Sequence, residues 1–404
     1  MTVPEVLFWG SLGLVGYTYV GYPGISWTLA RLRPRPVRTG PITPTMTVLI
    51  AAHNEEAGIG AKLENLLELD YPPDRLDLVV VSDGSTDRTA ALVEEYASQH
   101  PGRVTLVALP ERQGKASALN TGAAHASGDI LLLADARQGF DRAVARALAR
   151  HFADPEVGAV SGELILMTQG RDGQGAGLDA YWRYEKWLRQ TESRWGSSMG
   201  YTGAVSAIRR SLFRSLPPDT LVDDLVVPLR VIAGGLRVVF EPGARAFDRL
   251  SPIPGREFSR KVRTLVGVLQ TCIESRRFVG PLGAGTWCQL LSHKLSRLAV
   301  PYALAAILLA CALSDGLLYR TLLVAQALTY ALGVSSLVFS RDRVPRLAAI
   351  PAAFLMLNAA AVVAAFGYFT GRRLDLWRRP VSSGQDRGGR GSEVPAGSSE
   401  KNAA

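Results

Sequence analysis

The chain has 404 residues, which is enough for one large catalytic domain and additional elements. Its net charge of +9 suits an anionic lipid surface or a phosphorylated substrate. Nucleic acid is not expected as a partner, because the arginines are spread over loops and apolar flanks and form no single stripe. The spacing of the three cysteines indicates neither a zinc site nor a disulfide framework.

The N-terminal residues 1–31 are predicted to form a transmembrane anchor. Val6 to Leu29 is an apolar run without a charged side chain, long enough for a bilayer core of about 30 Å. Arginines follow this run and none precedes it, so the positive-inside rule places the following chain in the cytoplasm. We therefore expect an integral protein of the plasma (inner) membrane with a cytoplasmic catalytic domain. Residues 32–45, rich in Pro and Arg, are predicted to be an extended linker.

From residue 46 the pattern alternates between apolar strands and helices. The predicted strands are Thr47–Ala52, Leu76–Ser82, Val104–Ala108 and Asp129–Ala134, and the predicted helices are Ala61–Leu69, Thr86–Ser98 and Lys115–Ala126. This alternation predicts an α/β domain over residues 46–255, with a mostly parallel sheet between helices. Ligands of such sheets bind beyond the carboxyl ends of the strands, where acidic and polar clusters stand in this sequence.

The C-terminal part is predicted to associate with a membrane. Residues 256–297 are predicted to form amphipathic interface helices, because basic and apolar side chains alternate at helical spacing in Glu257–Glu274. About three transmembrane segments follow over residues 298–370, and a basic, then Gly/Ser-rich disordered tail over 371–404. Three crossings after a cytoplasmic domain leave the tail outside, whereas its arginines favour the inside, so the number of crossings stays open.

Three motifs carry the residues that we expect to bind a nucleotide. In VLIAAHNEE (Val48–Glu56) a strand runs into a polar loop suited to a base and ribose, although a helix cap explains it equally well. In VVVSDGSTDRT, Asp83 ends a buried strand and is placed to bind the nucleoside, the alternative being a turn and cap. In the third motif, Lys115 begins a helix that suits a diphosphate, and Asp135 ends another buried strand.

Together, in this order and spacing, the motifs resemble glycosyltransferase family 2, the inverting enzymes of GT-A fold, over about residues 46–280. The added membrane segments are similar to those of polysaccharide-synthase-like members. The resemblance implies a nucleotide-sugar donor, of UDP type, and a glycan or lipid-linked acceptor in cell-surface or extracellular polysaccharide synthesis. The donor-binding residues that it implies are Ala52, His53, Glu55, Asp83, Lys115 and Asp135.

The resemblance also implies a divalent cation, Mg²⁺ or Mn²⁺. Family members carry Asp-x-Asp, but this chain has Arg137 where the second acid stands. An arginine offers no oxygen ligand, so either Asp135 holds the ion with the donor diphosphate or Arg137 replaces part of its charge.

The segment TLVDDLVVPLRVIAGG resembles the family's Glu-Asp motif, whose second acid is the catalytic base. Counting back from Arg230, which matches the family's arginine, places the base at Asp224. Asp223 takes the place of the glutamate and orients the acceptor or the base. The alternative is that both acids only cap a helix.

Two further segments are similar to acceptor and diphosphate contacts of the family. Gly203, in GYTGAVSAIRR, lies in the acceptor loop, where small residues allow close approach. Arg260 and Arg263 stand near the place of a basic motif that contacts the leaving diphosphate. Thr264 replaces the tryptophan of processive synthases, which favours a short or single addition.

Three alternatives remain. A polyprenyl-phosphate glycosyltransferase has the same donor site and a different acceptor. A nucleotidyltransferase more often opens with a Gly-rich loop and a lysine, which this chain lacks at its first strand. A catalytically weakened membrane scaffold is the third, because the second metal-binding acid is missing.

Overall fold

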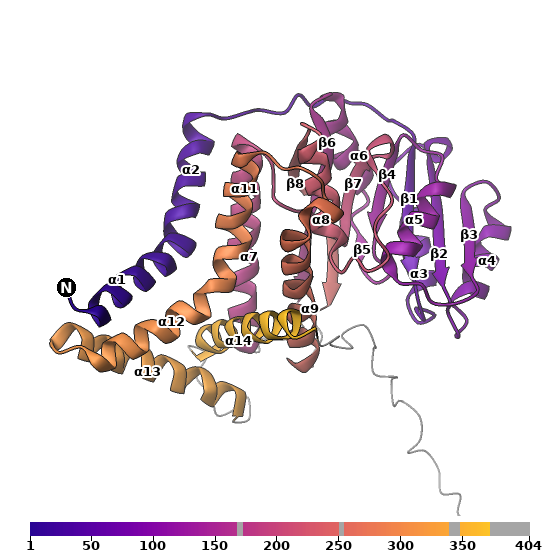
Figure 1. Cartoon of the computed structure of the whole chain (residues 1–404). Helices are drawn as coiled ribbons and strands as arrows, with labels where there is room; N and C mark the ends of the chain where they lie inside the picture. The colour runs from indigo at the N-terminus through magenta and orange to yellow at the C-terminus, as the bar shows by residue number, and fades with distance from the viewer. Residues whose placement is uncertain (168–172, 250–253, 339–347, 372–404) are drawn as a thin grey trace, which may run out of the picture.

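The computed structural model describes residues 1–167, 173–249, 254–338 and 348–371. Its centre is one eight-stranded mixed sheet with the order β3-β2-β1-β4-β7-β6-β8-β5, flanked by helices (Figure 1). The strands are β1 Met46–Ala52, β2 Leu76–Asp83, β3 Val104–Leu109, β4 Ile130–Ala134, β5 Gly139–Phe140, β6 Val157–Met167, β7 Val205–Arg209 and β8 Arg237–Arg249.

The four strands predicted from the sequence form the parallel half of this sheet. β1 pairs in parallel with β2 and β4, and β2 pairs in parallel with β3. The residues of β1 and β4 are almost all buried, because helices cover both faces. One core lies between the sheet and α3, α4 and α6, and a second lies between the sheet and α5, α8 and α9. The predicted α/β class is confirmed.

The other half of the sheet mixes strand directions. β7 runs antiparallel to both β4 and β6, β6 is parallel to β8, and β5 is antiparallel to β8. Because β5 pairs with β8, the segment that follows β4 is held next to a strand more than 100 residues away in the chain.

The helices around the sheet begin close to the predicted positions. They are α3 Ile59–Leu67, α4 Thr89–Gln99, α5 Lys115–His125, α6 Val144–Ala149, α7 Gly173–Trp195, α8 Asp223–Ala233, α9 Pro254–Ile273 and α10 Ser275–Phe278. The prediction was wrong at the start of α4, which begins three residues late. The carboxylate of Asp87, in the loop before α4, accepts hydrogen bonds from the amide and hydroxyl of Thr89, the first residue of the helix.

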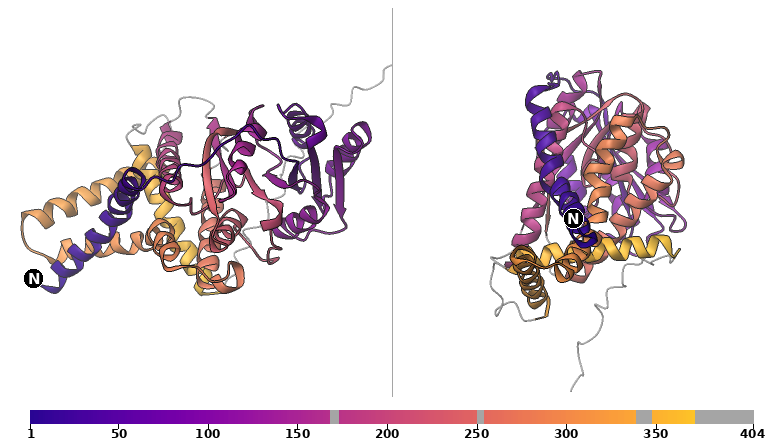
Figure 2. Two further views of the ribbon diagram at one scale, coloured as in Figure 1. Left: turned by 90° about the horizontal axis from the view of Figure 1, so that it is seen from above. Right: turned by 60° about the vertical axis from the view of Figure 1, so that its left-hand side comes forward.

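The N-terminal segment is a bent helix. α1 (Val3–Gly16) and α2 (Tyr22–Leu32) are joined by a π-helical turn. α1 lies along α12 (Ser296–Leu313), whereas α2 lies along α7 at the side of the catalytic domain (Figures 1 and 2). This segment is not among the described helices that are long and apolar enough to cross a membrane.

The Pro/Arg-rich segment after α2 is extended, and it is tied to the domain. The Arg35 amide donates to the Arg194 carbonyl at 2.7 Å, and Arg237 donates to the Arg35 carbonyl at 2.8 Å. The Arg38 amide donates to the Asp154 carboxylate at 3.1 Å. The segment is therefore a strap along the domain between the N-terminal helix and β1.

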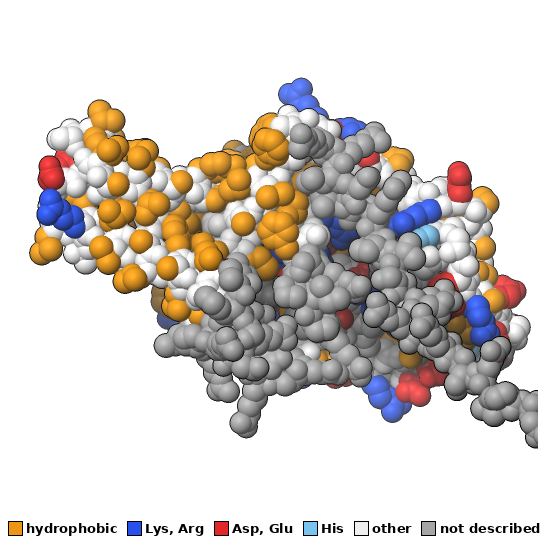
Figure 3. All heavy atoms as spheres, turned by 90° about the horizontal axis from the view of Figure 1, so that it is seen from below, with side chains coloured by type: hydrophobic (Ala, Val, Ile, Leu, Met, Phe, Trp, Pro, Cys, Tyr) orange, Lys and Arg blue, Asp and Glu red, His pale blue; other side chains and the backbone are white. Residues whose placement is uncertain are grey.

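Three described helices are long and apolar enough to span a bilayer: residues 284–313, 317–335 and 349–369. The first unites α11 (Ala284–Leu290), a π-helical turn and α12, so it begins inside the region expected to hold interface helices. α13 (Leu317–Val338) projects beside α12, and α14 (Ala349–Phe369) crosses beneath α7 and α9. In the view of Figure 3, hydrophobic side chains cover the projecting part of the molecule, to which α12 and α13 belong. The tail expected over 371–404 lies outside the described residues, except Gly371.

Candidate active site

The ammonium of Lys115 is the point on which the acidic residues of the site converge. Lys115 is the first residue of α5, and its Nζ lies 3.0 Å from Oδ1 of Asp135, which directly follows β4. The same Nζ lies 3.5 Å from Oδ1 of Asp223 at the start of α8. Three separate chain segments thus meet beyond the carboxyl ends of the parallel strands, as the sequence predicted.

Asp83 positions the turn that carries this lysine. It ends β2, is 3% exposed, and accepts hydrogen bonds from the amides of Gln113 at 2.6 Å and Gly114 at 2.9 Å. Gly84, at φ 58°, lies so close to this turn that a Cβ would stand 2.3 Å from the Arg112 nitrogen. Asp83 therefore braces the loop before α5, and its expected contact with the nucleoside remains a proposal.

The residues of the first motif lie beside Asp83. Ala52 is the buried last residue of β1, and Nδ1 of His53 lies 2.6 Å from the Asp83 carbonyl oxygen. The amide of Glu55 donates to the Thr89 hydroxyl at 2.8 Å. The polar loop after β1 is thereby held against the end of β2 and the loop that follows it, next to Lys115.

Asp224 follows Asp223 in the first turn of α8 and lies beneath the loop of Gly203. A Cβ at Gly203 would lie 3.7 Å from Oδ2 of Asp224 and 3.9 Å from Nζ of Lys115. Tyr201, which is 1% exposed, fixes this loop by donating its amide to the Asp224 carbonyl at 3.0 Å. The predicted base and acceptor loop therefore face each other.

The charges of the site shift two pKa values in useful directions. Burial, together with the neighbouring charge of Asp223, raises the pKa of Asp224, although the cation of Lys115 acts against this. Burial alone lowers the pKa of Lys115, but Asp135, Asp223 and Asp224 together raise it above its ordinary value. A carboxylate with a raised pKa is a better proton acceptor at neutral pH, and the lysine stays charged.

The predicted diphosphate contacts on α9 have other partners in this structure. Arg260 forms an ion pair with Glu257, and its carbonyl accepts the Thr264 hydroxyl at 2.9 Å. α9 packs tightly against the loop before α8, where a Cβ at Gly267 would lie 2.7 Å from Val222. Arg263 lies one turn before this contact, so α9 borders the site, and the direct contacts of Arg260 and Arg263 with diphosphate remain proposals.

The residues present fit a divalent cation only when a ligand supplies further oxygens. Within the described parts of the chain, no group of three acidic, histidine or cysteine side chains is arranged to hold a metal. Asp135 is 37% exposed at the mouth of the site, whereas Arg137 is exposed. Because Mg²⁺ is commonly held by one or two carboxylates together with substrate phosphates, Asp135 suits a cation that arrives with a diphosphate.

Sequence reasoning missed the basic residues behind Asp224. Arg189 lies on α7, and Lys294 lies on the helix of residues 284–313. Their positive charges favour a lower pKa of Asp224, against the effect of burial. Arg189 reaches the loop of Gly203 through a contact of 3.5 Å with the Thr202 hydroxyl. No local motif marks these residues, because they come from helices far apart in the chain.

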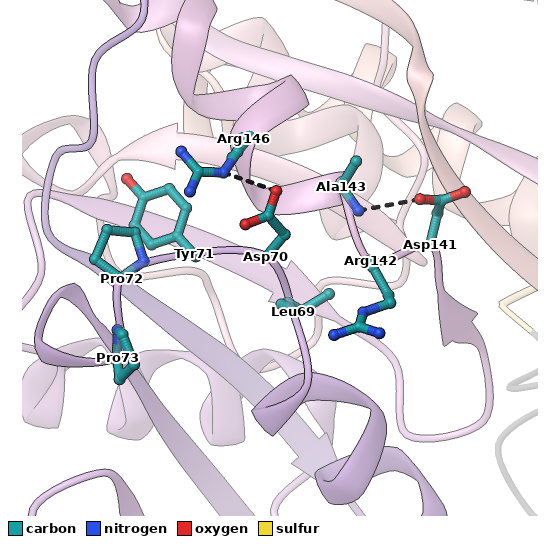
Figure 4. Close-up of a pocket in the computed structure, with 9 residues that line it drawn as sticks. All are labelled: Leu69, Asp70, Tyr71, Pro72, Pro73, Asp141, Arg142, Ala143 and Arg146. Carbon is teal, nitrogen blue, oxygen red and sulfur yellow. Dashed lines mark hydrogen bonds and ion pairs between the residues drawn. The ribbon is translucent and has the colours of Figure 1, made fainter.

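A pocket of about 660 Å³ lies elsewhere on the domain (Figure 4). It is bordered by the segment after α3 and the start of α6, where Arg146 and Asp70 form an ion pair of 3.0 Å. Its Tyr71 donates to the carbonyl of Pro44, just before β1, so the pocket lies toward the amino ends of the strands, away from the carboxylates.

The eight-stranded sheet between helices, with carboxylates around Lys115 beyond the strand ends, has the GT-A architecture of glycosyltransferases. The family model "Glycosyl transferase family 2" matches residues 47–216 of this chain.

Known proteins share this architecture. An N-acetylglucosaminyltransferase of Rhizobium meliloti is 33% identical over 224 residues, 52% of each chain. A poly-beta-1,6-N-acetyl-D-glucosamine synthase of Staphylococcus aureus is 26% identical over 226 residues, 55% of this chain and 54% of its own. The solved mannosyltransferase PcManGT from Pyrobaculum calidifontis, in complex with GDP-Man and Mn²⁺, is 26% identical with a TM-score of 0.69, covering 92% of this chain and 100% of that one. The chain spans about half the length of the curated relatives that it matches.

Proposed function

We propose that this protein is a membrane-bound inverting glycosyltransferase that transfers a sugar from a nucleotide-sugar donor to a glycan or lipid-linked acceptor. The observation that carries the proposal is the convergence of Asp135, Asp223 and Asp224 on Lys115, with the Gly203 loop open beside the base. Cell-surface or extracellular polysaccharide synthesis is the proposed role, supported by the synthase relatives and the three apolar helices. A plasma-membrane location with a cytoplasmic catalytic domain belongs to the same proposal.

The proposed reaction is one in-line displacement. Asp224 removes the proton of the acceptor hydroxyl, whose oxygen attacks the anomeric carbon of the donor. The bond from that carbon to the diphosphate breaks, and the nucleoside diphosphate leaves on the opposite face, so the configuration inverts. Lys115 stabilises the charge that develops on the leaving group. Asp135 and the donor phosphates would hold a divalent cation, which would supply additional neutralisation.

We infer that Ala52, His53, Glu55 and Asp83 form the nucleoside end of the donor site. Their support is their place at the ends of β1 and β2, next to Lys115. We propose a UDP-type donor, and GDP-mannose is the second donor to test because the solved relative holds it.

The test uses the full chain purified in detergent with UDP-glucose, UDP-N-acetylglucosamine and GDP-mannose, Mn²⁺ and a native membrane extract. Asp224→Asn is expected to abolish transfer while the Kd for the donor stays within about threefold, because the amide keeps the shape and loses the base. Asp219→Asn is the matched control, since this exposed acid in the loop before α8 pairs with Arg277. Turnover retained in Asp224→Asn would contradict the proposed role.

A further inference from the structure

A cluster of basic side chains surrounds Glu185 on α7, where α7 meets α9 and the long helix of residues 284–313. The carboxylate of Glu185 lies 2.7 Å from Lys294, 2.5 Å from Arg297 and 3.4 Å from Arg189. Lys261 on α9 also interacts electrostatically with Glu185. We call Arg189, Lys261, Lys294 and Arg297 the basic cluster.

The basic cluster keeps an excess of positive charge. With Arg260 it contains five cations, and four carboxylates among the described residues interact with them: Glu185, Glu192, Asp224 and Glu257. The formal charge of this group is therefore +1 when His293, which lies between Glu185 and Glu192, is neutral. Largely buried positive charge without a counterion is unfavourable, so an anionic ligand would stabilise this region.

One edge of the Arg297 guanidinium has no hydrogen-bond acceptor among the described residues, although the guanidinium lies 5.5 Å from the ring centre of Tyr184. Its Nη1 donates to Glu185, whereas its buried Nε and Nη2 make no hydrogen bond with the parts of the chain that the structure describes. Nε and Nη2 form the edge of an arginine that binds a phosphate or carboxylate through two parallel hydrogen bonds. A buried donor pair of this kind is expected where a ligand supplies the acceptor.

Lys261 is a second cation without a carboxylate bonded to it among the described residues. Its Nζ lies 4.5 Å from the ring centre of Trp182 and 5.0 Å from that of Tyr181. Burial lowers the pKa of Lys261 to about 8, although the charge of Glu257 opposes this effect. A bound anion would stabilise the charged form of this lysine.

The basic cluster is connected to the proposed base. Arg189 contacts the hydroxyl of Thr202 at 3.5 Å, and Thr202 stands between Tyr201 and Gly203, the residues that border Asp224. Lys294 and Arg297 belong to a helix apolar enough to cross a membrane, where charged side chains usually mark a functional site. An anion on the cluster would therefore lie between the apolar helices and Asp224.

We propose that the basic cluster binds the phosphate or diphosphate of a lipid-borne acceptor and so presents the acceptor hydroxyl to Asp224. The inference rests on the proposed function and specifies its acceptor class. It accounts for the uncompensated charge, for the unpartnered edge of Arg297, and for the placement of the cluster on the helix that carries Lys294. An uncharged acceptor would need none of these features.

The test measures inhibition of transfer by farnesyl phosphate, farnesol and inorganic phosphate, with the full chain in detergent. Farnesyl phosphate should inhibit at least about tenfold more strongly than the other two, because only it combines a chain with the anion. Farnesol acting equally well would overturn the inference, since the site would then recognise the chain alone. Inorganic phosphate acting equally well would overturn the lipid-borne source of the anion.

Two mild variants test the residues. Arg297→Lys keeps the charge but loses the two-donor edge, and Lys261→Gln removes a cation that has no ion pair. Each should raise the ratio of acceptor KM to donor KM about tenfold or more, whereas Arg194→Gln, an exposed arginine of the same helix α7, should not. The inference would be overturned if both variants are folded, as checked by Tm, and leave this KM ratio unchanged. It would also be overturned if the variants change only the inhibition by the nucleoside diphosphate product. Transfer to the native membrane extract separates the two proposals: its absence in the parent protein defeats the proposed function itself.

Discussion

The ammonium of Lys115 lies 3.0 Å from the carboxylate of Asp135 and links the first residue of α5 to the end of β4. This contact orders the candidate site, because the same ammonium also holds Asp223. The cation of Lys115 offsets part of the repulsion among the three acids that lie close together at this point. The expected consequences of changing this arrangement can be measured.

Lys115→Gln should lower kcat/KM for transfer by about 10²- to 10³-fold, because a donor to the leaving group is lost. It should also move the acid limb of the pH profile to higher pH, since the cation that lowers the pKa of Asp224 is gone. The control is Lys186→Gln. Lys186 forms an ion pair of 2.6 Å with Glu163 and is not one of the residues around Lys115. A pH profile that does not move would argue against the coupling.

Asp223→Asn should shift the acid limb of kcat/KM to lower pH. Asp224 must be ionised to accept a proton, so activity rises with pH through its pKa, which the negative charge of Asp223 raises. Removing that charge lowers the pKa of Asp224 and lets the base ionise at lower pH. The pH profile of kcat/KM checks this independently of the height of its plateau. A limb that moves upward would show that the pair is coupled in another way.

Gly203→Ala and Gly84→Ala should differ in their effects on folding stability. A methyl group at Gly203 meets Asp224 only at ordinary contact distances of 3.6 and 3.7 Å, so stability should change by less than about 0.5 kcal/mol. It fills space in front of the base, so acceptor KM should rise. At Gly84 the methyl group would collide with the Arg112 backbone at a positive φ, and about 1–3 kcal/mol or more should be lost. Tm and acceptor KM measure both effects, and a stable Gly84→Ala variant would show that the turn is free to move.

Arg137→Asp should strengthen activation by Mn²⁺. The substitution places a second carboxylate two residues after Asp135, and divalent cations of this kind prefer oxygen ligands. The Mn²⁺ concentration that gives half-maximal transfer should fall by about tenfold, a change worth about 1.4 kcal/mol of binding free energy. Asp135→Asn should remove the response to Mn²⁺. If chelation of metal leaves transfer by the parent protein unchanged, the metal proposal fails.

The parallel half of the sheet could be predicted because its strands are short apolar runs, two of which, β2 and β4, lead directly to an aspartate. Asp83 and Asp135 stand at strand ends that topology brings to one edge, so their proximity to Lys115 followed from the pattern. The start of α4 was misplaced because Asp87 still belongs to the preceding loop and accepts the Thr89 amide, a contact between side chain and backbone that composition does not reveal.

The antiparallel half and the basic cluster could not be predicted in the same way. β6, β7 and β8 pair across long stretches of chain, and β6 and β8 shift register within their ladder. Arg189 and Lys294 come together only because α7 packs against the helix that follows α10. Such contacts depend on tertiary packing, which leaves no periodic signal in either segment.

The strap of residues 33–45 has a consequence for how the acceptor is reached. Because Arg237 and Asp154 hold this segment along the domain, the segment does not act as a flexible linker between the N-terminal helix and the domain. In the proposed membrane arrangement, the active site therefore stays at a constant distance from the lipid surface, and a lipid-borne substrate reaches it by lateral diffusion. Replacing the strap by a longer glycine-rich linker should make that distance variable without changing any catalytic group.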